Sequence, residues 1–135
     1  RSAKDQHECI WMDGKIHLAA ARSMIFALMT RVDGERLGRV MINKIRPGGM
    51  IYPHADTPVH AEYWDRFHVC IQSAPGCNFR CGDETVYMAQ GECWWFQNSN
   101  EHEVINNSKD DRIHLIVDIR TSHINAKGDL PTVNT

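Results

Sequence analysis

A series of short segments rich in β-branched and aromatic residues makes up most of this chain from residue 39 onward. The segments span residues 39–45, 50–55, 66–73, 78–81, 85–88, 92–97, 102–106 and 112–119. Turn-forming stretches such as PGG, APG, CGDE, AQG and NSKDD separate them. This pattern is typical of strands. About eight strands after one helix predict an all-β fold, a jelly-roll or related β-sandwich with a flanking helix.

A helical period precedes the strands. Apolar or small residues recur at every fourth position between residues 15 and 32, namely Ile16, Ala20, Met24, Leu28 and Val32. Asp13 is a candidate cap for this helix and Gly34 a candidate end. We therefore expect a helix over residues 15–32 that packs on the outside of the β-core, residues 39–119. Residues 121–135 show no periodicity and are predicted to form a tail or a lid.

Size and charge restrict the classes of protein that the chain can represent. At 135 residues and 42% hydrophobic content, it has the size of one domain, residues 1–135, with a real core. The formal net charge of -2 and the lack of a Lys/Arg stripe argue against nucleic acid or an anionic membrane as a partner. The longest apolar stretch, residues 18–29, is interrupted by Arg22 and Ser23 and falls short of the ~20 residues that span a bilayer. We expect a soluble protein, and its oligomeric state stays open.

The cysteines predict free thiols. The chain has five, and no two of them form a CxxC pair: Cys9, Cys70, Cys77, Cys81 and Cys93. This pattern indicates neither a disulfide scaffold nor a zinc ribbon. In an extended strand Cys77 and Cys81 would lie ~13 Å apart, beyond the ~7 Å limit for a disulfide. Buried free thiols favour a reducing compartment, the cytoplasm.

Two segments carry polar and apolar residues on opposite strand faces, because side chains alternate along a strand. In residues 112–119 one face carries Ile113, Leu115, Val117 and Ile119, and the other carries Arg112, His114, Ile116 and Asp118. Residues 66–73 repeat the arrangement, with Arg66 and His68 on the polar face. In a sandwich without a helical cover the polar faces would be solvated. If the helix covers the apolar face, the polar faces line the interior, where a guanidinium needs an anion such as a small dicarboxylate.

A candidate metal site begins at the sequence PHAD, where His54 and Asp56 fall on one face of a strand. With His102 from another strand they would form the two-histidine, one-carboxylate triad of non-haem iron(II) oxygenases. Arg112 follows His102 by ten residues. It would lie on the next strand and clamp the far carboxylate of a 2-oxo acid bound to the metal.

These stretches resemble the aspartyl/asparaginyl β-hydroxylase family of iron(II)- and 2-oxoglutarate-dependent dioxygenases. The resemblance runs from about residue 39 to 119 and rests on NKIRPGGMIYPH, RFH, GCNFRCGDET, GE with WWF, NSNEHEV and DRIHLIVDI. It implies a double-stranded β-helix, a cupin-like jelly-roll. It also implies His54 and His102 as iron ligands and Arg112 as the partner of the 2-oxoglutarate side-chain carboxylate. Further co-substrate contacts implied in the same way are Arg66, His68 and Asn43.

One position departs from part of the family. Vertebrate-type aspartyl β-hydroxylases lack the acid two residues after the first histidine, whereas this chain has Asp56. We expect Asp56 to bind the metal. The alternative is that its carboxylate points at the substrate or at a bound water.

The resemblance implies that the chain hydroxylates an unactivated C–H bond with O2 and 2-oxoglutarate, releasing succinate and CO2. The expected substrate is a small molecule or peptide, with the reaction on an amino-acid side chain. We expect residues 57–65 to form a loop, and this loop and the tail are candidates for substrate recognition. The alternatives are a non-oxidative, metal-dependent cupin-like isomerase or epimerase, and a non-catalytic sugar- or peptide-binding β-sandwich. Arg112 argues against both, because neither needs a buried cation.

Other residues of the same chemical types have simpler interpretations. We expect His7, His17, His60 and His123 on the surface. His114 is either a packed core histidine or part of the surroundings of the site. The aromatic residues Trp94, Trp95 and Phe96 are expected to fill the core. Glu101 and Glu103 either orient His102 or are solvated at a strand edge.

Overall fold

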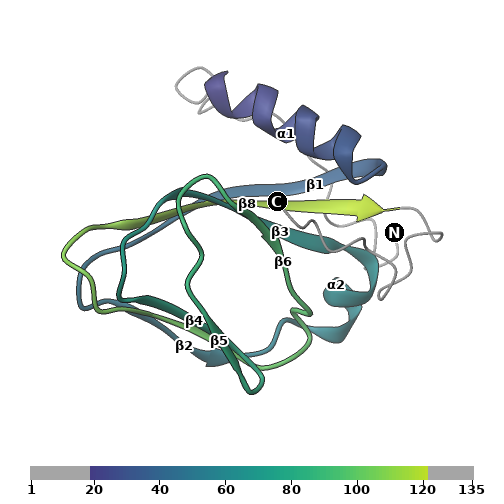
Figure 1. Ribbon diagram of the computed structural model, residues 1–135. Coiled ribbons are helices and arrows are strands. Elements are labelled where there is room, and N and C mark those ends of the chain that lie inside the picture. The colour runs from purple at the N-terminus through teal and green to yellow at the C-terminus, as the bar shows by residue number, and fades with distance from the viewer. Residues whose placement is uncertain (1–18, 122–135) are drawn as a thin grey trace.

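The computed structural model describes residues 19–121, shown in Figure 1. In chain order the elements are α1 (Ala19–Arg31), β1 (Gly34–Ile45), β2 (Met50–His54), α2 (Pro58–Tyr63), β3 (Asp65–Gln72), β4 (Cys77–Cys81), β5 (Glu84–Val86), β6 (Cys93–Trp95), β7 (His102–Asn106) and β8 (Arg112–Thr121). The strands form two four-stranded sheets of order β1-β8-β3-β6 and β2-β7-β4-β5. The paired strands are antiparallel. Figure 1 shows the two sheets facing each other, with α1 over the outer face of the first, so the predicted jelly-roll architecture is confirmed.

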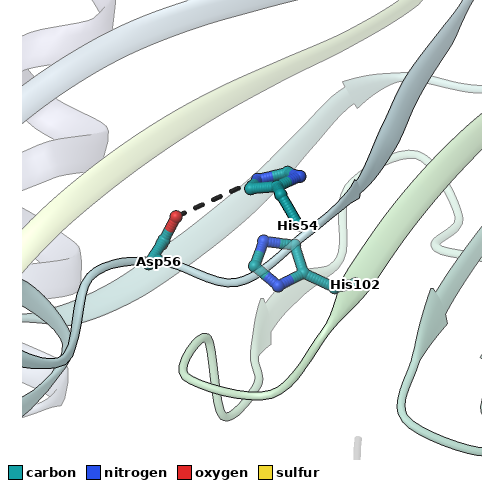
Figure 2. Close-up of side chains that lie close together, drawn as sticks. All are labelled: His54, Asp56 and His102. Atoms are coloured by element: carbon teal, nitrogen blue, oxygen red, sulfur yellow. Dashed lines mark ion pairs between the residues drawn. The ribbon is translucent and has the colours of Figure 1, made fainter.

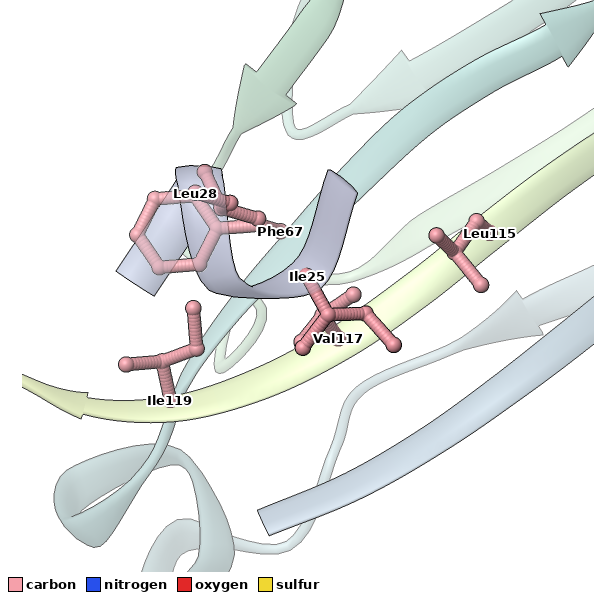
Figure 3. Close-up of a cluster of buried hydrophobic side chains, with 6 residues drawn as sticks. All are labelled: Ile25, Leu28, Phe67, Leu115, Val117 and Ile119. Carbon is pink, nitrogen blue, oxygen red and sulfur yellow. The ribbon is translucent and has the colours of Figure 1, made fainter. Parts of the chain in front are cut away.

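Helix α1 covers the apolar face of β8 and β3. Side chains from the helix and both strands form one buried cluster, drawn in Figure 3: Ile25, Leu28, Phe67, Leu115, Val117 and Ile119. Val117 and Ile119 are fully shielded from solvent. Burial of such a side chain stabilises the fold by about 1.5–3 kcal/mol. The alternation predicted for residues 66–73 and 112–119 is therefore correct.

The polar faces of the same strands point between the two sheets. Arg112, His114 and Asp118 are at most 2% exposed. The polar faces are therefore not solvated, as they would be in a sandwich without a helical cover. A second apolar cluster shares this interior and consists of Ile45, Phe79, Met88, Phe96 and Val104. The barrel interior thus combines an apolar part with a strip of buried polar groups.

The helix differs from its prediction at the end and in the face that it buries. Within the described residues it spans Ala19–Arg31, and the proposed cap Asp13 lies outside them. Asp33, with φ 53°, adopts the left-handed conformation after the helix, whereas Gly34 already begins β1. Met24 is 39% exposed, while Ile25 and Leu28 are buried. A strict four-residue step winds off one face by about 40° per step, because an α-helix has 3.6 residues per turn.

The structure also contains a helix that the sequence did not predict. Residues 57–65 were expected to be a loop, but α2 occupies Pro58–Tyr63. Its six residues are too few to show a helical period. The available signal was Thr57 followed by Pro58, because proline is favoured in the first turn of a helix. Strand β1 begins at Gly34 rather than at residue 39, and register shifts near Leu37 interrupt its alternation.

The described cysteines are free thiols, as expected. Cys70 and Cys77 are buried, but Cys81 is half-buried and Cys93 is exposed. Burial was therefore predicted correctly for two of them and wrongly for Cys93, which lies on the edge strand β6. Cys9 lies outside the described residues, as do His7, His17, His123 and the tail from residue 122. Neither helix within residues 19–121 has the length and apolar character to cross a membrane.

The contact between α1 and the sheet predicts a large difference between two isoleucines. Ile119→Ala should lower the free energy of unfolding by about 2–5 kcal/mol, because it leaves a cavity under the helix. Ile42→Ala, at a residue 47% exposed, should change it by less than about 0.5 kcal/mol. Urea unfolding measures both. Similar losses in the two variants would contradict the packing described here.

Candidate metal centre

Three predicted ligands converge from two strands and a loop. His54 ends β2, His102 begins β7, and the two are register partners in the sheet. Asp56 follows two residues after β2, so the expectation that it shares a strand face with His54 is wrong, although its side chain still joins the cluster. One potential ligand atom from each of the three residues lies within 4.8 Å of the other two. Figure 2 shows the two imidazoles and the carboxylate turned toward one another.

The backbone determines which imidazole nitrogens are available to a metal. Nδ1 of His54 lies 2.8 Å from the carbonyl oxygen of Tyr52, and Nδ1 of His102 lies 2.8 Å from that of Asn100. A carbonyl only accepts, so each Nδ1 carries the proton and each Nε2 keeps its lone pair. Burial lowers the pKa of His102, and the neighbouring His54 adds to this effect. The neutral form of His102, which is the form that binds metal, is therefore favoured.

The two oxygens of Asp56 have different surroundings. Oδ1 lies 3.9 Å from Nε2 of His54. Oδ2 accepts hydrogen bonds from Nη1 of Arg66 at 3.0 Å and from Nδ2 of Asn98 at 2.8 Å. The backbone N–H of Asp56 donates to the carbonyl of Asn98 at 2.9 Å. One oxygen is thus held by donors while the other faces the imidazoles. Two neutral imidazoles and one carboxylate oxygen suit a divalent transition metal such as iron(II).

Arg66 is enclosed by carboxylates. It donates to both oxygens of the buried Asp118, from Nε at 2.7 Å and from Nη2 at 2.9 Å, as well as to Asp56. A contact between Arg66 and a co-substrate would be additional to these bonds. His60 was expected on the surface, but its side chain is only 10% exposed and its Nε2 lies 3.2 Å from Asp118. That expectation is wrong because α2, which was not predicted, turns His60 inward.

Arg112 is the second guanidinium of the interior and lacks the partners that Arg66 has. It is 2% exposed. Its Nη2 atom is buried without a hydrogen-bond partner, and no carboxylate of residues 19–121 forms an ion pair with it. Burial lowers its pKa to about 10. A buried cation without a counter-charge is costly, so this position favours binding of an anion.

Two further unpartnered atoms lie on the same face. His114 follows Arg112 by two residues, and Asn43 on β1 is the register partner of His114. Nε2 of His114 and Oδ1 of Asn43 are buried and have no hydrogen-bond partner in the part of the chain that the structure describes. Nδ1 of His114 lies 3.3 Å from Nδ1 of His68, so one of these nitrogens donates to the other. Arg112, His114, His68 and Asn43 form a buried polar strip, the name used below for these four residues.

Phe96 stands between the metal ligands and the buried polar strip. Its ring centroid lies 4.9 Å from that of His102 and 5.1 Å from that of His68. It belongs to the core, as expected, and also borders the site, whereas Trp94 and Trp95 are only half-buried. Glu101 and Glu103 both form ion pairs with Arg80; the side chain of Glu101 is 60% exposed and therefore solvated, as one of the two expectations had it, whereas that of Glu103 is 20% exposed.

Asn98 is a site residue that the sequence analysis missed. It is 2% exposed and binds Asp56 through both its side chain and its backbone. The sequence NSN before His102 was interpreted only as a turn. Asparagine is common in turns for reasons unrelated to a ligand, so only the buried position of its side chain reveals this contact.

These features place the chain among proteins of the cupin-like double-stranded β-helix fold with a candidate metal centre. Two solved structures share the fold: the cupin domain of Cnp3 from Schizosaccharomyces pombe (TM-score 0.51, 9% identity, 67% of this chain and 59% of that one) and a predicted oxalate decarboxylase from Thermotoga maritima (TM-score 0.50, 15% identity, 70% and 72%). Residues 11–122 match the family model described as aspartyl/asparaginyl beta-hydroxylase, and the chain belongs to that family. The resemblance seen in the sequence is confirmed.

Relatives with related names match parts of the chain. The aspartyl/asparaginyl beta-hydroxylases of Mus musculus and Homo sapiens are 26% and 31% identical to it over 82% and 64% of this chain, which covers 15% and 11% of their lengths. The L-proline cis-4-hydroxylase of Rhizobium meliloti (strain 1021) is 26% identical over 69% of this chain and 33% of its own length. The chain thus spans at most a third of each of these relatives. They are hydroxylases, and enzymes of this kind are what the chain is similar to.

His114, one of the two histidines of the buried polar strip, predicts a pH dependence of stability. Burial and the nearby Arg112 lower the pKa of His114 to about 3. Between pH 6.5 and about pH 3 the unfolded chain binds a proton that the folded chain does not. His114 should therefore contribute a fall in the free energy of unfolding of at most about 1.4 kcal/mol per pH unit below pH 6.5 and nothing above it, and the burial that lowers the pKa of His68 adds a slope of the same sign.

Substitution of His114 tests this dependence. Urea unfolding of the metal-free protein at pH 6 and pH 5 should show a shallower slope in His114→Asn than in the wild type. Ile116→Val, on the same face of β8, should leave the slope unchanged. If His114→Asn has the wild-type slope, then His114 is not held neutral by burial.

Proposed function

We propose that this chain is an iron(II)- and 2-oxoglutarate-dependent dioxygenase that hydroxylates an unactivated C–H bond of an amino-acid side chain. The observation that carries the proposal is the buried Arg112, which forms no ion pair with a carboxylate of residues 19–121, in a chain that also gathers the exposed His54, the half-buried Asp56 and the buried His102 into one cluster. A dicarboxylate that reaches from a metal to a guanidinium satisfies both sites at once. Membership of the hydroxylase family supports the same reaction.

The ligand set fits iron(II) in the proposed site. Nε2 of His54, Nε2 of His102 and Oδ1 of Asp56 would bind the metal and leave other coordination positions open. Iron(II) with 2-oxoglutarate and O2 would supply the oxidising power for C–H hydroxylation, with succinate and CO2 as co-products. The residues contribute geometry: the carbonyls of Tyr52 and Asn100 fix the two imidazoles, which orients their lone pairs before a metal arrives.

The buried polar strip would hold the other end of the co-substrate. Arg112 donates to the distal carboxylate through Nη2, and Asn43, which lies across from His114 on β1, is a further proposed contact. His68, at the metal side of the strip and packed against Phe96, is a further proposed contact. Arg66 is proposed to contact the metal-side carboxylate in addition to Asp56 and Asp118. Phe96 and Phe79 line this interior and exclude water from it.

The substrate proposal rests on the relatives. Their names specify aspartyl, asparaginyl and L-proline hydroxylation, which supports a free or peptide-bound amino acid as the substrate. We propose that helix α2 and residues 121–135 contribute to its recognition, and that residues 1–135 form one catalytic domain. The free thiols of the described residues support a reducing compartment such as the cytoplasm.

The two rival functions use the same fold without O2. An isomerase or epimerase, or a non-catalytic ligand-binding protein, has no need for a dicarboxylate beside the metal. A 2-oxoglutarate-dependent hydroxylase requires both O2 and the dicarboxylate. Succinate release coupled to the gain of one oxygen by an added amino acid or peptide separates the proposal from both rivals.

Spectroscopy of the metal complex gives a first test. Under anaerobic conditions iron(II) and 2-oxoglutarate together should produce a weak visible charge-transfer band, because the co-substrate chelates the metal. His102→Ala should abolish the band by removing a ligand, while Glu84→Ala, at an exposed residue of β5, should retain it. A wild-type protein that shows no band on adding both components would exclude the oxygenase.

The two buried arginines predict opposite effects on stability. Arg112→Met should weaken 2-oxoglutarate binding by about 100-fold or more with little change in iron(II) affinity. It should not destabilise the metal-free protein, because it removes an uncompensated buried charge. Arg66→Met should lower the free energy of unfolding by about 3–5 kcal/mol, because it leaves Asp118 buried and unpaired.

Calorimetric titration and urea unfolding measure these effects. The role of Arg112 as the co-substrate partner is refuted if Arg112→Met binds 2-oxoglutarate as tightly as the wild type. A loss of stability in Arg112→Met as large as that in Arg66→Met would show instead that Arg112 is a structural residue.

A further inference from the structure

We propose that Arg66 and Asn98 are positioning residues that hold the Asp56 carboxylate in the orientation needed to bind the metal through Oδ1. This inference rests on the metal centre proposed above and assigns new roles to two residues beside it. Neither residue needs to touch the metal. Their effect on the metal would pass through Asp56.

The hydrogen bonds of Asp56 are all on one side of its carboxylate. Oδ2 accepts from Nη1 of Arg66 and Nδ2 of Asn98, at 3.0 and 2.8 Å. Oδ1 has no hydrogen bond among those of the described residues and lies 3.9 Å from Nε2 of His54. Rotation of the carboxylate would break two bonds that are both charge-assisted, because the acceptor is a carboxylate oxygen, and the bond from Arg66 also has a charged donor. Such bonds are about twice as strong as neutral ones, so the observed orientation is favoured.

Asp56 needs this support because its backbone lies outside the sheet. Strand β2 ends at His54, and the pairing with β7 ends there as well. The backbone of Asp56 is held by its bond to the carbonyl of Asn98, at 2.9 Å. Asn98 is 2% exposed and therefore cannot move away easily. The reciprocal pair of bonds between Asp56 and Asn98 compensates for the lost strand pairing.

Arg66 is itself anchored to the rigid part of the fold. It is the register partner of Asp118 on β8, and Asp118 is fully buried. The bidentate pair, with bonds of 2.7 and 2.9 Å, leaves Nη1 directed at Asp56. His60 of α2 contacts Asp118 at 3.2 Å and closes this network. The metal-binding carboxylate is thus connected through Arg66 to the central strands of the first sheet.

This arrangement gives Asp118 and Asp56 different roles in one network. Asp118 neutralises the charge of Arg66 and fixes its plane. Asp56 accepts from a further N–H of the guanidinium and keeps one oxygen for the metal. A lysine at position 66 would retain a charge opposite Asp118, but it lacks the planar fork that reaches both carboxylates.

A double-mutant cycle on metal affinity tests the inference. Iron(II) alone is titrated anaerobically into the full chain, without 2-oxoglutarate, for the wild type, Arg66→Lys, Asn98→Ala, Asp56→Ala and the two double variants with Asp56→Ala. Arg66→Lys and Asn98→Ala should each weaken iron(II) binding by about 10–100-fold when Asp56 is present. In the Asp56→Ala background each should change it by less than about 2-fold, because the residue through which they act is gone.

A matched substitution controls for the change of arginine to lysine. Arg80 also bridges two carboxylates, those of Glu101 and Glu103, but it lies outside the ligand cluster. Arg80→Lys should leave iron(II) affinity unchanged. Thermal unfolding of each variant verifies that it is folded, and Asn98→Ala keeps the test valid if Arg66→Lys does not fold.

The outcomes separate this inference from the proposed function. The inference is overturned if the substitutions at Arg66 and Asn98 leave affinity unchanged, or weaken it equally with and without Asp56. In either case the proposed function stays intact if iron(II) still binds and its binding depends on His54 and His102. A wild-type protein that does not bind iron(II) overturns the metal centre and, with it, the role of Asp56.

Discussion

The packing of α1 on the outer face of β8 and β3 determines what the interior of this protein must contain. Once Val117, Ile119 and Phe67 are buried under the helix, strand alternation turns Arg112, His114 and Asp118 toward the opposite sheet. The sandwich therefore has polar and charged groups in its core. Each of these groups requires a partner there, and the partners define the site.

The two interior guanidinium groups satisfy this requirement in different ways. Arg66 is paired with Asp118 and Asp56 within the chain, which makes it part of the structure. Arg112 forms no ion pair with a carboxylate of residues 19–121, and its pKa is lowered to about 10 by burial. The protein bears the cost of one uncompensated cation, and a bound dicarboxylate would offset it. In the proposed function the same residue would thus reduce the stability of the empty protein and bind the co-substrate, a combination that is common where function and stability compete.

The metal cluster depends on the sheet for its histidines and on side-chain contacts for its acid. His54 and His102 are register partners, so the antiparallel pairing of β2 and β7 brings them together. Asp56 reaches the same point from a loop, held by Asn98 and Arg66. The strands alone are sufficient to place the two imidazoles.

Residues on regular strands were the ones that the sequence predicted well. The alternation in residues 112–119 placed Arg112 inside, and the motif chemistry together with the family resemblance brought His54, Asp56 and His102 into one cluster, as the structure shows. The contacts of Arg66 could not be predicted, because Asp118 is 52 residues away and meets it only through the register of β3 and β8. The inward position of His60 depends on α2, which is too short for a periodic signal.

A crystal structure of the protein with iron(II) and 2-oxoglutarate, prepared without oxygen, tests the central claim most directly. We expect the metal on Nε2 of His54, Nε2 of His102 and Oδ1 of Asp56, and the far carboxylate of 2-oxoglutarate on Nη2 of Arg112. A metal bound elsewhere, or a dicarboxylate held by other residues while Arg112 keeps its unpartnered nitrogen, would contradict the account.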